Sequence, residues 1–134
     1  MLKKNPGTVK VVFKNYPIPR HQFSSKAAAA ALAAASRGKF WEYHDRLFAK
    51  ENFGKLNDQK FLGIAKVLGM NPQEFDAKMK DPEVRAKVRR DFEEGQRAGV
   101  RGTPTIFVNG RLLKNRSLKG FQGSIDRELK VNKK

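Results

Sequence analysis

Residues 99–111 read Gly-Val-Arg-Gly-Thr-Pro-Thr-Ile-Phe-Val-Asn-Gly-Arg, and no other stretch says as much about the fold. Residues 105–108 are β-branched or aromatic, which is typical of a short strand. Asn109 and Gly110 come next, and this pair favours a two-residue type I′ turn because both residues tolerate a positive φ. Residues 111–113 then return as the partner strand. The stretch therefore predicts a β-hairpin, with Pro104 at its entrance, where the missing N–H costs least.

The rest of the chain has the pattern of one strand and several helices. Residues 8–13 are rich in Val and Phe and favour a buried strand, which the prolines of residues 16–19 end. A block of helices follows to residue 99, beginning with an alanine-rich helix over 26–36, and a last helix follows the hairpin. We expect helix N-caps at Ser25, Asn57 or Asp58, Asn71, Asp81 and Ser117. The second helix is expected to bury one face, made of Phe40, Trp41, His44, Leu47 and Phe48.

The chain is strongly basic. Its 134 residues include 29 Lys and Arg against 13 Asp and Glu, which gives a formal net charge of +16. Such a charge attracts polyanions without specificity. The basic residues are spread along the chain, and only residues 87–90 and the terminal Lys133 and Lys134 form local clusters. A solvated basic surface is one interpretation, and a basic nucleic-acid-associated protein is an alternative function.

Cysteine is absent from the sequence. This excludes a disulfide, a zinc–thiolate site and a thiol nucleophile within these residues. The two histidines, His21 and His44, lie far apart in the sequence, so no metal site is expected, and no motif indicates a cofactor. Residues 5–7 are Asn-Pro-Gly where a signal peptide would be apolar. No run approaches the roughly 18 apolar residues of a membrane span, so with Met1 as the true start we expect a cytoplasmic chain.

Several stretches together resemble the DsbA-type branch of the thioredoxin superfamily. The resemblance implies an α/β chain: a partial thioredoxin-like fold with a large helical insertion, a small sheet of about three strands, and a cis Pro104 before the hairpin. It implies a single domain over 1–134, in which 8–16 and 103–134 form the thioredoxin-like part and 20–99 the helical insertion. The stretches that carry the resemblance are residues 11–19 with His21, 27–35, 38–48, 65–70 and 99–105.

The family's catalytic unit has no counterpart here. Its members open with another strand and a Cys-x-x-Cys motif at a helix N-terminus, which lowers the pKa of a reactive thiolate. The resemblance therefore implies a relative of thiol:disulfide oxidoreductases that is truncated and, without cysteine, redox-inert. Family members work in the cell envelope or periplasm, and the resemblance implies that location for an intact parent. Whether the chain belongs to an enzyme stays open at this point.

The resemblance also carries a binding site over to this sequence. In the family, the loop before the hairpin binds extended polypeptide in a way that resembles strand addition. The residues that match this loop are Thr103 and Pro104, with Arg101 and Gly102 as neighbours that shape it. A non-catalytic peptide-binding module that uses this groove is thus a second alternative function.

The absent opening strand would lie in the middle of the family's sheet. Without it, residues 9–13 and the strand over 105–108 are left with open edges, and such edges seek a partner. We expect the gap to be closed in one of two ways. Either the two segments pair directly and antiparallel, or a second copy, as a homodimer, or another chain supplies the missing strand.

Overall fold

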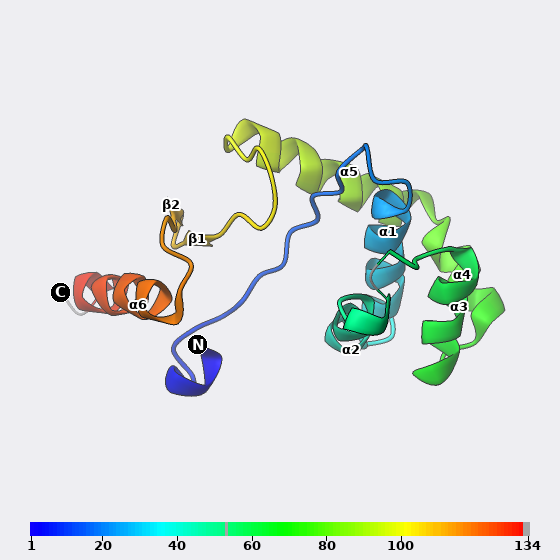
Figure 1. Ribbon diagram of the computed structural model, residues 1–134, viewed down its shortest axis with the longest axis horizontal. Coiled ribbons are helices and arrows are strands. Elements are labelled where there is room, and N and C mark those ends of the chain that lie inside the picture. The colour runs from blue at the N-terminus through cyan, green and yellow to red at the C-terminus, as the bar shows by residue number, and fades with distance from the viewer. Residues whose placement is uncertain (53, 133–134) are drawn as a thin grey trace. The chain divides into compact units, whose positions relative to one another are not determined.

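The computed structural model describes residues 1–52 and 54–132 (Figure 1). The chain divides into two compact units. The helical unit comprises residues 14–99, and the terminal unit comprises residues 1–13 together with residues 100–134. Each unit has its own elements and its own buried residues.

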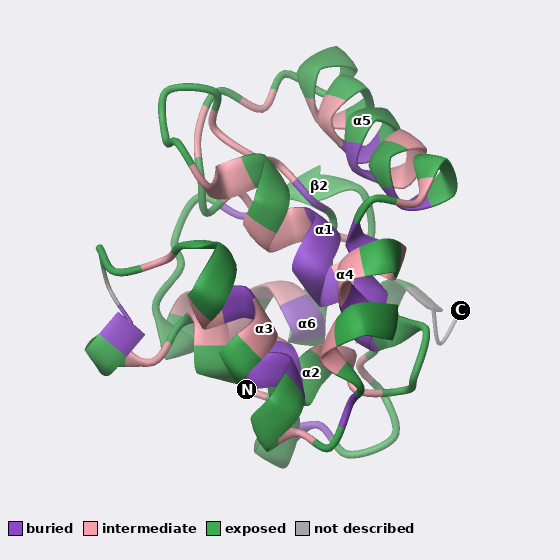
Figure 2. Cartoon of the chain, turned by 90° about the vertical axis from the view of Figure 1, so that its right-hand side faces the viewer, coloured by how far each residue is buried: buried purple, intermediate pink, exposed green. Residues whose placement is uncertain are grey.

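The helical unit is built around the alanine-rich helix α1 (Ser24–Ala35). This helix contacts α2 (Phe40–Leu47), α3 (Asp58–Val67), α4 (Pro72–Met79) and α5 (Pro82–Arg97). Small alanine side chains let several helices approach one axis closely, and Ala30 and Ala34 are completely buried. A short 3-10 turn, η2 (Lys50–Asn52), lies between α2 and α3. The buried face of α1 is visible in Figure 2 as the purple part of its ribbon.

Side-chain caps fix where three of these helices begin. The Asn57 Oδ1 accepts a hydrogen bond from the Lys60 N–H at 2.8 Å, and the Asn71 Oδ1 accepts one from the Gln73 N–H at 2.9 Å. Asp81 caps α5 in the same way. These predicted caps are confirmed. The cap predicted at Ser25 is wrong, since α1 starts at Ser24 without a side-chain cap.

The start of α1 is instead set by the turn before it. The Ser24 Oγ accepts a hydrogen bond from the Ile18 N–H at 2.9 Å, so this hydroxyl is engaged outside the helix. The contact joins the proline-containing segment to the first turn of α1. A local capping pattern could not reveal it, because it depends on how the preceding segment folds back.

The predicted buried face of α2 needs a correction. Trp41 and Phe48 are 45% and 60% exposed, whereas Tyr43 is completely buried. The Tyr43 hydroxyl donates to the Phe61 carbonyl at 2.9 Å, and its ring stacks on that of Phe75. Burial raises the pKa of this phenol. A buried hydroxyl with a partner is well tolerated, so the helix turns the tyrosine inward and two aromatic rings outward.

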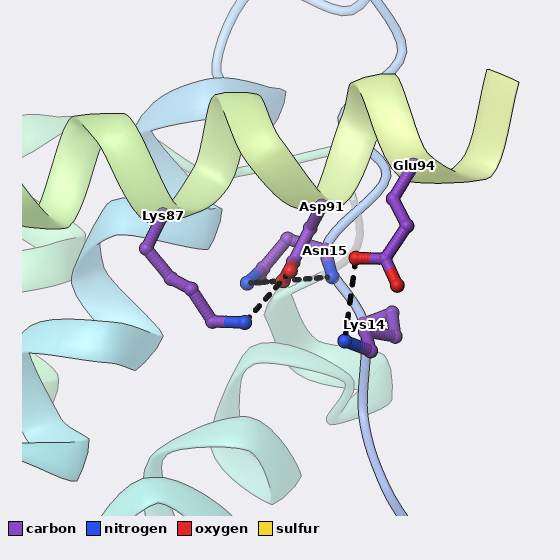
Figure 3. Close-up of polar contacts among 5 residues, drawn as sticks. All are labelled: Lys14, Asn15, Lys87, Asp91 and Glu94. Atoms are coloured by element: carbon purple, nitrogen blue, oxygen red, sulfur yellow. Dashed lines mark hydrogen bonds and ion pairs between the residues drawn. The ribbon is translucent and has the colours of Figure 1, made fainter. Parts of the chain in front are cut away.

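A second buried polar group, the Asp91 carboxylate of α5, binds Asn15 (Figure 3). The Asp91 carboxylate accepts hydrogen bonds from the Asn15 backbone N–H at 3.0 Å, the Asn15 Nδ2 at 2.9 Å and the Lys87 Nζ at 2.8 Å. Burial alone would raise the pKa of Asp91, but these hydrogen bonds and the Lys87 charge together hold that pKa below its ordinary value. Beside this cluster, Lys14 and Glu94 form an exposed ion pair at 3.5 Å.

The terminal unit holds the hairpin and the last helix. Strand β1 (Phe107–Val108) pairs antiparallel with β2 (Arg111–Leu112), with Phe107 opposite Leu112. Asn109 and Gly110 have φ values of 48° and 80°, as a type I′ turn requires. The predicted hairpin is confirmed. The unit also contains a 3-10 turn, η1 (Leu2–Lys4), and helix α6 (Leu118–Asn132), which Ser117 caps through the Gly120 N–H.

The predicted sheet of about three strands is wrong for the described residues, in which the sheet has two strands. Residues 9–13 run as an irregular, drawn-out segment, and Val11 and Val12 are exposed. The expected direct pairing with the hairpin does not form. A β-favouring sequence becomes a strand only when a neighbour supplies ladder hydrogen bonds. Within the described part of the chain, residues 9–12 have no such neighbour.

The first residues are nevertheless fixed to α6. The Asn5 Nδ2 donates to the Gln122 Oε1 at 2.9 Å, and the Gln122 Nε2 donates back to the Asn5 Oδ1 at 3.0 Å. Asn5 is buried, so this reciprocal pair satisfies both side-chain amides.

No helix among the described residues is long and apolar enough to cross a membrane.

Candidate functional site

The terminal unit contains an open hollow of about 480 Å³, which we call the hairpin groove. One wall is the loop over residues 101–106, which leads into β1. The other wall is the return arm, which starts at the end of β2 and covers residues 112–116. The lining residues are Arg101, Gly102, Thr103, Pro104, Thr105, Ile106, Leu112, Leu113, Lys114 and Arg116.

Three hydrogen bonds hold the two walls in place. The Leu113 N–H donates to the Ile106 carbonyl at 2.8 Å and extends the hairpin by one step. The Arg116 Nη1 donates to the Pro104 carbonyl at 2.7 Å, which ties the return arm to the loop. Within the loop, the Thr105 Oγ1 donates to the Gly102 carbonyl at 2.6 Å. The Thr103–Pro104 peptide bond is cis.

The loop leaves backbone groups available next to this hollow. Among the described residues, neither Thr103 nor Thr105 makes a backbone hydrogen bond. Thr103 is exposed and Thr105 is half-buried, so water reaches this part of the loop. Free N–H and C=O groups on an extended loop are the requirement for binding another chain by strand addition.

The groove also offers apolar surface. Leu113 is buried and Ile106 is half-buried, while the Leu112 side chain is 54% exposed. The charged lining residues are Arg101, Lys114 and Arg116, and no lining residue is acidic. The groove therefore combines a hydrophobic floor, free main-chain groups and a positive rim.

All four residues that the sequence nominated line this one hollow: Arg101, Gly102, Thr103 and Pro104. The sequence reasoning missed the opposite wall, formed by Leu112, Leu113, Lys114 and Arg116. The sequence did contain a signal for part of this opposite wall. A two-residue turn at 109–110 places residue 113 opposite residue 106, so the pairing itself assigns the return arm to the groove.

The helical unit has a smaller hollow of about 310 Å³ between α1 and α4. Its charged side chains are paired already. The Arg37 Nη2 lies 2.7 Å from the Glu74 Oε2, and the Lys78 Nζ lies 3.3 Å from the Asp81 Oδ2. Among its described lining residues, this second hollow therefore has no uncompensated charge that would attract a charged ligand. The described residues also bring no group of three potential metal ligands together.

A family model described as "Thioredoxin" matches residues 1–127. The chain belongs to the thioredoxin family. A solved structure supports the same assignment: a thioredoxin-like oxidoreductase from Silicibacter pomeroyi DSS-3 superposes with a TM-score of 0.78 and 32% sequence identity. The match covers 89% of this thioredoxin-family chain and 68% of that one.

Curated relatives place the chain closer to one branch of the family. The probable disulfide bond formation protein D of Bacillus anthracis is 28% identical over 130 residues, and the match covers 92% of this chain and 59% of that protein. The chain is thus a DsbA-like member of the thioredoxin superfamily, as the sequence resemblance implied.

A second group of relatives is much longer than this chain. The Na(+)/H(+) antiporter NhaA of Herminiimonas arsenicoxydans is 35% identical over 97 residues, and the match covers 72% of this chain but 15% of the antiporter. The antiporter NhaA 1 of Salinispora arenicola matches at 35% identity over 104 residues, which is 16% of its length. The chain thus spans a small part of these antiporters and about three fifths of disulfide bond formation protein D.

Proposed function

We propose that these 134 residues are the polypeptide-binding part of a DsbA-like thioredoxin-family protein. The hairpin groove holds an extended segment of another protein. The residues themselves catalyse no thiol–disulfide exchange, because they include no cysteine. Serine and threonine hydroxyls cannot replace a thiolate in that reaction.

The observation that carries the binding proposal is the state of Thr103 and Thr105. Their backbone groups have no partner among the described residues, and they border a hollow with an apolar floor. An extended peptide bound along this loop donates to and accepts from the free main-chain groups. Its alternate side chains contact Leu112 and Ile106. Main-chain hydrogen bonds then supply affinity without sequence preference, while side-chain contacts supply selectivity.

The binding proposal is tested with an unfolded, reduced and carboxymethylated protein that carries a fluorescent label. Fluorescence anisotropy measures its affinity for the chain and for two leucine variants of the terminal unit. Leu112 lines the groove and is 54% exposed, whereas Leu118 lies outside the lining and is 68% exposed. Leu112→Ala is expected to weaken binding roughly fivefold, as the loss of about 1 kcal/mol of apolar contact implies. Leu118→Ala is expected to leave the affinity unchanged.

A neutral blocking variant provides a stronger version of the same test. Thr103→Trp fills the entrance of the groove without changing its charge and is expected to abolish measurable binding. Equal affinities for the original chain, Leu112→Ala and Thr103→Trp would mean that polypeptide binds elsewhere or not at all. Circular dichroism of each variant shows whether the fold is kept.

The redox part of the proposal has its own experiment. Insulin is reduced by dithiothreitol with and without the chain, and the rate of B-chain precipitation is followed by turbidity. The two rates are expected to agree. An acceleration by the chain, proportional to its concentration, contradicts the proposal that these residues are redox-inert.

A further inference from the structure

The charge of this chain is unevenly divided between its two units. Of its 13 acidic residues, only Asp126 and Glu128 belong to the terminal unit, and all the others lie in residues 14–99. The terminal unit's basic residues up to the end of the described chain are Lys3, Lys4, Lys10, Arg101, Arg111, Lys114, Arg116, Lys119, Arg127 and Lys130. The unit that carries the hairpin groove is therefore the more positive of the two for its size.

Both acidic residues of this unit are engaged on α6, away from the groove lining. The Glu128 carboxylate faces the Arg111 Nε at 3.5 Å and accepts from the Asn109 Nδ2 at 3.5 Å. The Asp126 Oδ1 accepts from the Gln122 Nε2 at 2.9 Å. Neither carboxylate lines the groove, so no acidic side chain in the described part of the unit neutralises the cations of its rim.

Those rim cations are available to a ligand. Arg101 and Lys114 are exposed and have no ion-pair partner among the described residues. Arg116 uses one guanidinium N–H for the Pro104 carbonyl, which is neutral, so its charge remains uncompensated. The hollow of the helical unit differs on this point, because its Arg37 and Lys78 each face a carboxylate.

We propose that the hairpin groove selects extended polypeptide segments in which acidic side chains flank an apolar residue. This inference rests on the proposed function and names its substrate class. The apolar residue lies against Leu112 and Ile106, and the acidic side chains lie within reach of Arg101, Lys114 and Arg116. Charge complementarity of this kind chiefly accelerates association and excludes the wrong partners. Basic segments are repelled by the same three cations.

The expected selectivity is modest and depends on salt. A single exposed ion pair contributes roughly 0.2–1 kcal/mol, which corresponds to about 1.5- to 5-fold in affinity. Two such pairs together give roughly 2- to 25-fold, a range that includes the tenfold effect taken for the test. Because salt screens charges over roughly 10 Å at 0.1 M, this effect is largest at low ionic strength and shrinks as salt is added.

The test uses three fluorescently labelled heptapeptides with the same central valines. Their flanking residues are Glu, Gln or Lys. The original chain is expected to bind the Glu peptide about tenfold more tightly than the Gln peptide, and the Lys peptide least, at low salt. The double variant Arg101→Gln/Lys114→Gln is expected to bind the Glu and Gln peptides with similar affinities.

A matched control separates the rim charges from the overall charge. Lys130 lies on α6 outside the groove lining, and it is exposed. Lys130→Gln removes one positive charge from the same unit and is expected to leave the preference for the Glu peptide unchanged. The single variant Lys114→Gln, which also removes one positive charge, is expected to lower that preference. If Lys130→Gln lowers it as much as Lys114→Gln does, the preference comes from net charge and the inference is wrong.

The remaining outcomes each have one meaning. Equal binding of all three peptides overturns the inference but leaves the proposed function standing. Failure of all three to bind overturns the proposed function and the inference with it. A single-stranded oligonucleotide that displaces the Glu peptide at physiological salt, and that loses affinity in the double variant, would make the groove a nucleic-acid site and overturn the inference. Support requires the Glu preference, its loss in the double variant and its retention in Lys130→Gln.

Discussion

The helical unit and the terminal unit differ most in what they bury. In the helical unit, Ala30, Ala34, Tyr43, Phe61 and Ala65 are completely buried around α1. In the described part of the terminal unit, the residues classed as buried are Asn5, Leu113 and Ile125. The unit with the larger core has no unpaired charges in its hollow, whereas the unit with the smaller core carries the groove. The comparison shows that the larger core and the hairpin groove belong to different parts of this chain.

The largest expected effect tests this contrast directly with two phenylalanines. Phe61→Ala removes a completely buried ring of the helical core and is expected to lower the free energy of unfolding by about 4 kcal/mol. Phe107→Ala changes a ring of β1 that is 41% exposed, and it is expected to cost less than about 1 kcal/mol. Urea unfolding followed by circular dichroism measures both. Similar losses in the two variants would break the comparison.

A smaller effect is expected within the helical unit, between two carboxylates of α5. Asp91→Ala leaves the Asn15 N–H and amide buried without their acceptor, and it is expected to cost about 3 kcal/mol. Glu94→Ala breaks the exposed pair with Lys14 and is expected to cost less than about 1 kcal/mol. Urea unfolding again gives both values. If Glu94→Ala proves as damaging as Asp91→Ala, burial is not what makes the Asp91 contacts important.

Two glycines of α6 provide a matched test of packing in the terminal unit. A Cβ on Gly120 would collide with the Asn115 carbonyl oxygen, so Gly120→Ala is expected to destabilise the start of α6 by about 2 kcal/mol. Gly123 has open space around it, and Gly123→Ala is expected to stabilise by about 0.5–1 kcal/mol. Thermal unfolding followed at 222 nm shows whether the two changes have opposite signs. Shifts of the same sign would contradict the close approach at Gly120.

The smallest expected effect is a change in pH dependence. The pKa of Asp91 is lower in the folded chain than in the unfolded one, so its ionised form stabilises the fold. That contribution is complete above the unfolded pKa, about 3.9, and is lost as the pH falls through the lower, folded pKa. Free energies of unfolding between pH 3 and 7 are therefore expected to converge for the original chain and Asp91→Asn as the solution is acidified. A constant difference across this range would contradict the assigned direction.

The sequence predicts those parts of the fold whose chemistry is local. Asn109 and Gly110 determine their turn by their own φ preferences, and Asn57, Asn71 and Asp81 cap helices whose N–H groups lie two or three residues away. The segment over residues 9–13 has a strand composition, but a strand also needs a neighbour. No pattern within those residues states whether one is present.

The groove and α2 show the same difference between features set by nearby residues and features set by distant ones. The loop wall of the groove follows from a contiguous motif, whereas Arg116 enters it through a hydrogen bond across twelve positions. On α2, both Tyr43 and Trp41 fit an aromatic helix face. The choice between them depends on the Phe61 carbonyl, which lies on another helix. In both cases a contact between residues far apart in the sequence determines which residue lines the groove or is buried, and the local pattern does not contain that contact.

The reciprocal amide pair between Asn5 and Gln122 also has a consequence for biosynthesis. The two residues are 117 positions apart, and the whole helical unit lies between them in the sequence. On a ribosome, the residues of the helical unit emerge long before Gln122 does, and domains generally fold in the order in which they are made. The helical unit can therefore fold before Gln122 is made, whereas the contact that fixes Asn5 to α6 forms only after residues 14–99 have been synthesised.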